Sequence, residues 1–295
     1  MARHIPGVVI AYIHPGETSA YFVESMQTTQ LADMASRGPR RIVNIMQEWS
    51  SANVSDARNR VTARFLDART SDGATVGDWL LWVDADMQWN PDALDKLMES
   101  ADPEERPIVG GLCFGMANGE LVPTIYQLGR TDEDELCTYR VAAYERDSLI
   151  RCVATGAAFI LIHRRVLEAM REAQFNPAFP WFQETQMGDR PCGEDITFCL
   201  RAGQLGFSVF VDTRAKIGHH KSQLLTEDVY LAQTPPPLDG TVGLVIPTRG
   251  DHPDLLRAII ATSGLPADRV VIVSNGDGPL PDADLPAEKI HDPGP

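Results

Sequence analysis

Two carboxylates one residue apart, Asp84 and Asp86, follow the apolar run Trp79-Leu80-Leu81-Trp82-Val83. A short apolar run of this kind is typical of a buried strand. Asn90-Pro91 then breaks the chain, and residues 92–98 have the pattern of a helix. A strand that delivers Asp-x-Asp to a loop can place two hard oxygen ligands on one divalent cation. If that cation also holds a diphosphate, the chain transfers a group from a nucleotide.

The composition is that of a globular protein. The 295 residues are 43% hydrophobic and 23% charged, enough for one large domain or a domain and a half. The net charge of −15 disfavours a nucleic-acid partner without excluding one. No apolar run approaches the roughly 20 residues that cross a bilayer, and the N-terminus lacks the apolar region of a signal peptide. We therefore expect a soluble, cytoplasmic protein.

The five cysteines stand at unrelated spacings and match neither a disulfide framework nor a zinc pattern. This agrees with a reducing compartment, where free cysteines serve as small core residues.

The first half of the chain alternates strand and helix patterns. Strands are expected at residues 7–13, 41–46, 79–83 and 108–114, and helices at 19–35, at 55–68 and from Pro91 onward. This alternation predicts an α/β fold with a mostly parallel sheet and helices on both faces. Ligands in such sheets bind beyond the carboxyl ends of the strands. Asp84, Asp86 and His14 all lie at such ends.

The second half is less regular. It is expected to hold a hairpin-like stretch at 124–143, a buried strand at 153–162, helices at 164–173 and 194–202, a strand at 207–211, and a loop rich in aromatic residues and proline at 175–190. The Pro-rich residues 234–240 indicate a stiff linker after a main domain of residues 1–233. Residues 241–295 then predict a strand at 242–246, a helix at 253–263, a strand at 269–273 and a loose tail. This single β-α-β unit is too small for a comfortable independent domain.

Taken in order, four segments resemble the GT-A nucleotide-sugar glycosyltransferases, close to the family 2 type. They are Val54-Ser55-Asp56-Ala57-Arg58-Asn59-Arg60, Trp82-Val83-Asp84-Ala85-Asp86, Thr155-Gly156 through His163-Arg164-Arg165, and Cys192-Gly193-Glu194-Asp195 through Gly203 followed by Gly218-His219. Together they extend over residues 7–221. Residues 243–251 also look like the opening strand of such a domain, so the tail resembles a partial second GT-A unit.

The sequence departs from the family at two places. The first strand ends in Tyr12-Ile13-His14-Pro15, where the family has Pro and a small polar residue. The acidic residue that reads the base has no clear match, and Asn44, Gln47 or Glu48 could take its place. The base of the donor is therefore open, with a UDP-sugar favoured and a GDP-sugar as the other choice.

The resemblance implies a Rossmann-like GT-A fold and a metal-dependent reaction. Asp84, Asp86 and His219 would hold Mn²⁺ or Mg²⁺, which neutralises charge on the leaving nucleoside diphosphate. Asp86 is the more direct ligand in the family, whereas Asp84 more often touches the ribose or a metal-bound water. The alternative for His219 is an exposed loop position, and His220 takes its place if the register slips by one.

The same resemblance assigns the acceptor side to the helix at 194–202. Asp195 would be the general base, with Glu194 bonded to the acceptor hydroxyl, and an in-line attack inverts the anomeric centre. A retaining route stays open, and both carboxylates could instead be helix caps.

The remaining residues that we expect to bind substrate are His14, Arg58, Asn59, Thr155, Gly156 and Trp181. Arg58 and Asn59 would contact the nucleotide or hold the Asp84 loop, and Arg58 could equally be a surface residue. Thr155 and Gly156 would form the floor under the donor sugar, where a larger side chain clashes. Trp181 and Phe182 are candidates for stacking on an acceptor, against the alternative of core packing.

The sequence thus predicts a glycosyltransferase that moves a sugar from a nucleotide-diphosphate donor to a glycan, protein or other hydroxyl acceptor. Two alternatives stay open. A nucleotidyltransferase on a similar fold would need a basic, Gly-rich phosphate loop, and residues 10–17 have no Lys or Arg. A non-catalytic binding or assembly module would use the tail as its working surface.

Overall fold

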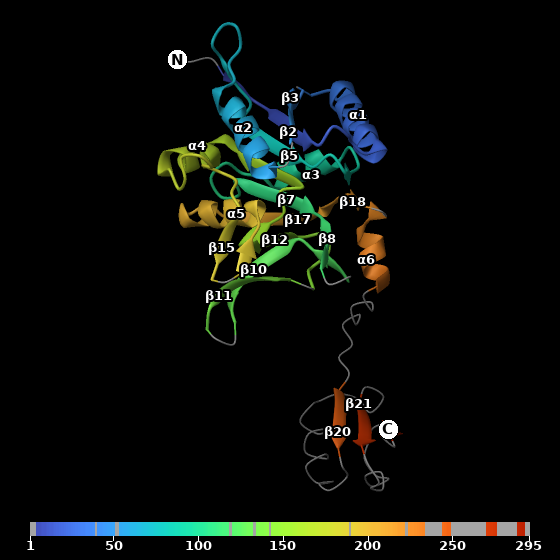
Figure 1. Ribbon diagram of the computed structural model, residues 1–295. Helices are drawn as coiled ribbons and strands as arrows, with labels where there is room; N and C mark the ends of the chain where they lie inside the picture. Colours follow the sequence, from blue (N-terminus) through green and yellow to red (C-terminus); the bar gives the residue numbers. More distant parts are fainter. Residues whose placement is uncertain are drawn as a thin grey trace. The chain divides into compact units, whose positions relative to one another are not determined.

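The computed structural model describes residues 4–38, 40–50, 53–117, 120–131, 134–141, 143–188, 190–221, 224–233, 244–248, 270–275 and 288–292. The chain divides into two compact units, Met1–Gln233 and Thr234–Pro295. Each unit is described by itself below (Figure 1).

The first unit is built on a seven-stranded sheet in the order β12-β17-β7-β14-β5-β2-β3. The strands are β2 (Val8–His14), β3 (Ile42–Trp49), β5 (Trp79–Val83), β7 (Ile108–Leu112), β12 (Leu149–Cys152), β14 (Phe159–His163) and β17 (Val209–Lys216). Strands β3, β2 and β5 pair in parallel, as do β7 and β17. The expected α/β class is therefore confirmed.

As expected, the sheet is mostly parallel: β3, β2, β5, β7 and β17 run in one direction. It is mixed because β14 runs antiparallel to both β5 and β7, and β12 runs antiparallel to β17. The direction of β14 follows from where the chain enters it. Ala158, just before this strand, lies beyond the carboxyl end of β5 and accepts a hydrogen bond from the Asp84 N–H at 2.9 Å. From that edge the chain can only run back across the sheet.

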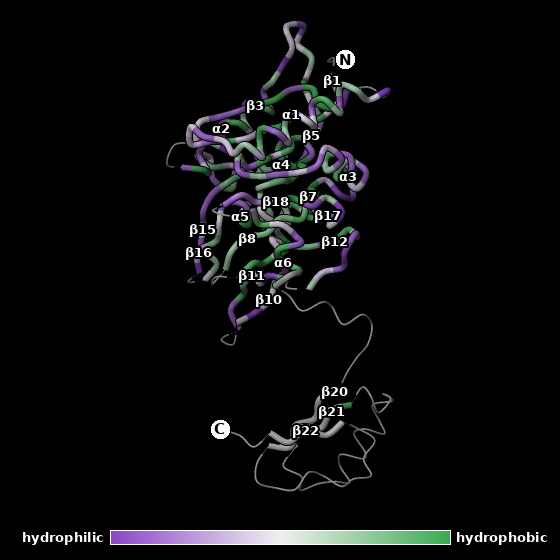
Figure 2. Tube along the Cα trace, turned by 90° about the vertical axis from the view of Figure 1, so that its right-hand side faces the viewer, coloured by the Kyte–Doolittle hydropathy of each residue, from purple (hydrophilic) through white to green (hydrophobic). Residues whose placement is uncertain are grey.

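In the part of this unit that the structure describes, five helices flank the sheet, and two separate hydrophobic clusters fill the space beneath them. The helices are α1 (Ala20–Ala35), α2 (Val54–Asp67), α3 (Ala93–Ser100), α4 (Arg164–Ala173) and α5 (Glu194–Gln204). Helices α2, α4 and α5 pack on one cluster, whereas α1 and α3 pack on the other. Figure 2 shows the hydrophobic stretches of this unit gathered in its middle.

Strand β5 explains this two-sided core. Leu80 and Trp82 belong to the cluster beneath α2, whereas Leu81 and Val83 belong to the cluster beneath α1. Successive side chains of a strand point to opposite faces, so an unbroken apolar run is what burial on both faces requires.

The helix starts follow local capping. The Ser19 hydroxyl caps α1 by accepting from the Phe22 N–H at 3.0 Å, and Asn53 caps α2 through the Asp56 N–H. The expectation that Pro91 begins a helix is wrong by two residues. The Ala93 N–H bonds back to the Asn90 carbonyl at 2.9 Å, so Pro91 lies in a turn before α3.

Short strands and one further helix complete the described part of this unit. They are β1 (His4–Ile5), β4 (Thr75–Val76), β6 (Met87–Gln88), β8 (Phe114–Ala117), β9 (Glu120–Pro123), β10 (Ile125–Arg130), β11 (Leu136–Arg140), β13 (Ala154–Thr155), β15 (Thr185–Met187), β16 (Arg190–Cys192), β18 (Gly218–His220), β19 (Leu224–Leu225) and α6 (Glu227–Gln233). The hairpin expected at 124–143 is formed by β10 and β11. The loop expected at 175–190 contains part of a second hairpin, β15 with β16.

In the second unit, β20 (Leu244–Thr248), β21 (Val270–Asn275) and β22 (Glu288–Asp292) form a parallel sheet in that order. The expected linker at 234–240 and helix at 253–263 lie outside the described residues. The expectation of a loose tail is wrong for residues 288–292, which form the third strand. Among the helices that the structure describes, none has the length and apolar character needed to cross a membrane.

Candidate functional site

A cavity of about 790 Å³ opens where the parallel strands β2, β3 and β5 end. Ile13, Ser50 and Asp84 line it from the ends of those three strands. The cavity thus lies at the edge of the sheet where the sequence predicted that a ligand binds. The other lining residues are Pro15, Glu17, Thr18, Ser19, Val54, Arg58, Ala85, Asp86, Glu184, Glu194, His219, His220 and Lys221.

Backbone hydrogen bonds from three distant segments fix the Asp84-Ala85-Asp86 loop. The Asp84 N–H donates to the Ala158 carbonyl at 2.9 Å, and the Ala85 carbonyl accepts from the Ser19 N–H at 2.9 Å. The Asp86 carbonyl accepts from the His220 N–H at 2.8 Å. Because the backbone is tied on both sides, the two carboxylates are held in a set position rather than on a mobile turn.

Strand pairing brings His219 to Asp86. Strand β18 lies antiparallel to β6, with His219 opposite Met87. The imidazole therefore reaches the carboxylate of Asp86, the residue before Met87. His219 Nε2 lies 3.2 Å from Asp86 Oδ2, and its Nδ1 lies 3.0 Å from the Phe114 carbonyl oxygen. Lys221 Nζ donates to the same Asp86 oxygen at 2.8 Å. Burial opposes ionisation, but the His219 and Lys221 hydrogen bonds prevail and lower the pKa of Asp86 to about 2.

Arg58 links the other aspartate of the pair to helix α5. Its guanidinium is buried, donates to Asp84 Oδ1 at 2.6 Å, and lies with Nε 3.4 Å from Glu194 Oε1. The rings of Trp82 and Phe182 lie 5.1 Å and 5.6 Å from its central carbon. Burial raises the pKa of Asp84, and the charge of Arg58 opposes that rise. Arg58 is therefore a buried cation that joins two carboxylates of the cavity.

Glu194 and Asp195 occupy the first turn of α5, but they face different surroundings. Glu194 lines the cavity, whereas Asp195 is not among the lining residues. Its Oδ1 accepts from the Ile196 N–H at 2.7 Å, and its Oδ2 would lie 3.6 Å from a Cβ added at Gly156. Burial, followed by the charge of Glu194, raises the pKa of Asp195 to about 6. A carboxylate with such a pKa can accept a proton near neutral pH.

The three residues expected to hold a metal, Asp84, Asp86 and His219, all line this cavity. They do not converge on one point: in the part of the chain that the structure describes, no three His, Cys, Asp or Glu side chains form a ready-made metal cluster. Asp86 and His219 bond to each other, and Asp84 turns to Arg58.

No protein-family model matches this chain, and no curated protein matches it either. Its structure is similar to that of A197 from STIV, with a TM-score of 0.50 and 14% identity over 75% of this chain and 91% of that chain. The fold is of the GT-A type.

Two further solved structures match with lower TM-scores. One is GalNAc-T7, crystallised with UDP, GalNAc and Mn²⁺, with a TM-score of 0.47 and 12% identity over 72% of this chain and 43% of that one. The other is a glycosyltransferase involved in glycosylation of the major capsid of PBCV-1, with a TM-score of 0.29 and 14% identity over 58% of this chain and 68% of that one.

Of the residues expected to bind substrate, Arg58 and Asp84 line the cavity, whereas His14, Asn59, Thr155, Gly156 and Trp181 do not. The His14 ring packs against Trp49, and its Nδ1 accepts from the Gly16 N–H at 3.2 Å. Asn59 is buried in the core beneath α2. Thr155 is 1% exposed, and its hydroxyl donates to the Thr124 carbonyl at 2.8 Å. These side chains bond to or pack against other parts of the protein and do not form part of the cavity surface.

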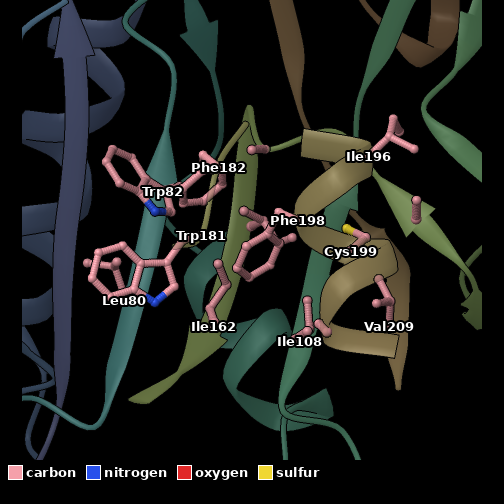
Figure 3. Packing of buried hydrophobic residues seen from close by; sticks show 14 of the residues in the cluster. Leu80, Trp82, Ile108, Ile162, Trp181, Phe182, Ile196, Phe198, Cys199 and Val209 are labelled. Carbon is pink, nitrogen blue, oxygen red and sulfur yellow. The ribbon is translucent and has the colours of Figure 1, made fainter. Parts of the chain in front are cut away.

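The suggested stacking of Trp181 and Phe182 on an acceptor does not fit their burial. Trp181 is 3% exposed and Phe182 is fully buried, both among the side chains of the core (Figure 3). The Trp181 indole N–H donates to the Leu167 carbonyl at 2.8 Å. In this structure the core alternative holds for both rings, since neither presents a face to the cavity.

Sequence reasoning missed several lining residues, of which Lys221, Glu17 and Glu184 are charged. A signal for Lys221 was present. Residues i and i+2 of an extended segment point to the same side, so Lys221 follows His219 toward Asp86. Glu17 and Glu184 come from loops, where no periodicity points to the site.

Proposed function

We propose that this protein is a metal-dependent glycosyltransferase that moves a sugar from a nucleotide-diphosphate donor to an acceptor hydroxyl. The observation that carries the proposal is the meeting of Asp84, Asp86 and Glu194 around one cavity at the carboxyl ends of parallel strands. A UDP-sugar is the first donor to test and a GDP-sugar the second.

The charges of the cavity suit a divalent cation. Among the described lining residues, the carboxylates Glu17, Asp84, Asp86, Glu184 and Glu194 outnumber the cations Arg58 and Lys221. Such a surface repels a diphosphate unless a cation enters with it. Asp84, Asp86 and His219 offer oxygen and imidazole ligands of the kind that Mn²⁺ accepts, and Mg²⁺ would use the carboxylates. When bound, the cation would neutralise charge on the leaving diphosphate.

The proposed roles of the other residues follow from their contacts. Asp195 takes the proton of the acceptor hydroxyl, a role that its pKa of about 6 supports, and in-line attack then inverts the anomeric centre. Glu194 faces the cavity and bonds the acceptor. Arg58 positions Asp84 and Glu194 relative to each other. Gly156 lies next to Asp195, and we expect it to form part of the floor under the donor sugar.

A thermal-shift panel of nucleoside diphosphates and nucleotide sugars, with and without Mn²⁺, tests the donor site. We expect a Mn²⁺-dependent rise in Tm with one nucleotide, because a ligand that binds the folded state alone stabilises it. EDTA should abolish the rise and also sugar transfer, and Mn²⁺ should restore both. If no nucleotide produces a shift, the protein is better explained as a non-catalytic GT-A-like module. If sugar transfer continues in the presence of EDTA, the proposed role of the metal is wrong.

The variant Asp84→Asn/Asp86→Asn is the matched negative control, because it keeps the size of both side chains while removing both charges. It should lose the Mn²⁺-dependent shift. Asp92→Asn/Asp95→Asn changes two aspartates outside this cavity by the same amount of charge and should keep the shift.

A further inference from the structure

Lys221 is the exposed cation of the cavity, and it is bound to a residue that the proposed function needs for metal. Its side chain is 56% exposed, and Nζ lies 2.8 Å from Asp86 Oδ2. His219 Nε2 approaches that same oxygen at 3.2 Å. In the part of the chain that the structure describes, Asp86 is the one carboxylate within ion-pair distance of Lys221.

The other cation of the cavity cannot move in the same way. Arg58 is 3% exposed, bonded to Asp84, and packed near two aromatic rings. Lys221, by contrast, is a point charge on a long flexible stem at the cavity surface. Of these two cations, Lys221 is therefore the one that is free to exchange partners.

An ammonium group and a divalent cation compete for a single carboxylate oxygen. Two positive charges within about 4 Å repel each other by roughly 1 to 4 kcal/mol in a partly solvated site, so a metal that binds Asp86 displaces the lysine. The displaced ammonium stays in the cavity that would receive the donor. There the ammonium can form a charge-assisted hydrogen bond to the diphosphate of the donor.

We propose that Lys221 is an exchangeable counter-ion of the metal site. It neutralises Asp86 when no divalent cation is bound, and it passes to the donor's phosphate when the cation takes Asp86. This inference rests on the proposed function, since it assumes the donor and the cation named there. It assigns to Lys221 a phosphate-binding role that depends on metal. It also predicts that loss of the Lys221 charge strengthens binding of the metal and weakens binding of the nucleotide.

The first test is Mn²⁺ alone, titrated into the full chain by calorimetry or electron paramagnetic resonance. Lys221→Gln should bind Mn²⁺ about 3- to 10-fold more tightly than the unaltered protein, because the competing ammonium is gone. Lys96→Gln is the matched control. It removes the same charge from a lysine that pairs with Asp92 and does not line this cavity, and it should leave the affinity for Mn²⁺ unchanged.

The second test is UDP, or GDP where UDP does not bind, measured at saturating Mn²⁺. Lys221→Gln should bind the nucleotide about 10-fold more weakly, the loss of one charge-assisted contact to phosphate. Lys221→Arg keeps the charge and should stay within a few-fold of the unaltered protein.

The outcomes separate the two proposals. Unchanged or weaker Mn²⁺ binding by Lys221→Gln overturns the exchange, whether or not the protein is a transferase. Tighter Mn²⁺ binding with unchanged nucleotide binding overturns the phosphate contact. Absence of both Mn²⁺ and nucleotide binding in the unaltered protein overturns the proposed function, and this inference with it.

Discussion

Two aspartates of the site differ in their proton affinity by several pKa units. Hydrogen bonds from His219 and Lys221 lower the pKa of Asp86 to about 2, whereas burial and the neighbouring Glu194 raise that of Asp195 to about 6. When the surroundings of two carboxylates push their pKa values apart in this way, one carboxylate suits a metal-ligand or electrostatic role and the other an acid–base role. The residue types are identical, so the difference comes from the neighbours alone.

Asp195→Asn should lose about 10²-fold or more in transfer, because it cannot take a proton. Activity of the unaltered protein should rise with pH through an apparent pKa of about 6, the value for Asp195. A pH profile of kcat/KM and a comparison of transfer rates check both expectations. Asp67→Asn, at an exposed aspartate on α2, is the control and should keep full activity. Transfer by Asp195→Asn at the rate of the unaltered protein would remove Asp195 as the base.

The same substitution should stabilise the fold at alkaline pH. An aspartate in an unfolded chain has a pKa near 3.9, so the folded state binds the proton more tightly and stability falls as pH rises from about 4 to about 6. Above that range ionised Asp195 costs on the order of 1 to 3 kcal/mol, which Asp195→Asn recovers. Thermal unfolding should show the variant more stable at pH 8, with the difference shrinking toward pH 4. A variant destabilised equally at both pH values would contradict this account.

At the scale of the element, two adjacent residues of helix α2 have different roles, one in the site and one in the core. Arg58 faces the cavity, while Asn59, one residue and about 100° further around the helix, faces the core. The Asn59 amide donates to the Ser55 carbonyl at 2.6 Å and the Phe182 carbonyl at 2.7 Å. Its oxygen accepts from the Trp181 N–H at 3.1 Å. Asn59 thus fixes the irregular segment that leads to Glu184 at the cavity.

Asn59→Ala should reduce the free energy of unfolding by about 2 to 4 kcal/mol, because it leaves buried backbone groups of residues 181 and 182 unpaired. Urea unfolding measures this loss. Asn44→Ala, at an exposed position of β3, should stay within about 0.5 kcal/mol of the unaltered protein. Equal stability of the two variants would show that Asn59 does not hold the segment.

At the scale of the whole molecule, the first unit contains both hydrophobic clusters and the cavity. All the described side chains in those clusters, and all those lining the cavity, come from Met1–Gln233. We propose that this unit is the glycosyltransferase domain and that residues 241–295 are a partial GT-A-like unit with another task.

Deleting residues 241–295 should leave Mn²⁺-dependent nucleotide binding intact. The Tm of the remaining unit should shift by no more than about 4 °C, which corresponds to roughly 1 kcal/mol for a domain of this size. Calorimetry of the truncated and full chains, each with nucleotide and Mn²⁺, makes the comparison. Loss of nucleotide binding in a truncated chain that still unfolds cooperatively would place the second unit in the active site.

The sequence by itself determined the features that depend on local pattern. The unbroken apolar run of β5, which precedes Asp84 and Asp86, indicates a strand buried on both faces, because a strand with one face in water would alternate polar and apolar residues. The helix at α4 matches its expected bounds, and the Asp-x-Asp loop lies at the expected edge of the sheet. These predictions need only the periodicity of side chains and the rule that parallel strands end at a common edge.

Tertiary structure alone decided which of the candidate residues face the cavity. Trp181 and Asn59 are buried because segments more than 100 residues apart in sequence meet there, a contact that no local pattern records. The direction of β14 depends on where residue 158 lies in space. Lys221 meets Asp86 only because β18 pairs with β6 across about 130 residues of chain. Side-chain type and spacing limit the chemistry, but long-range packing selects which groups come within bonding distance.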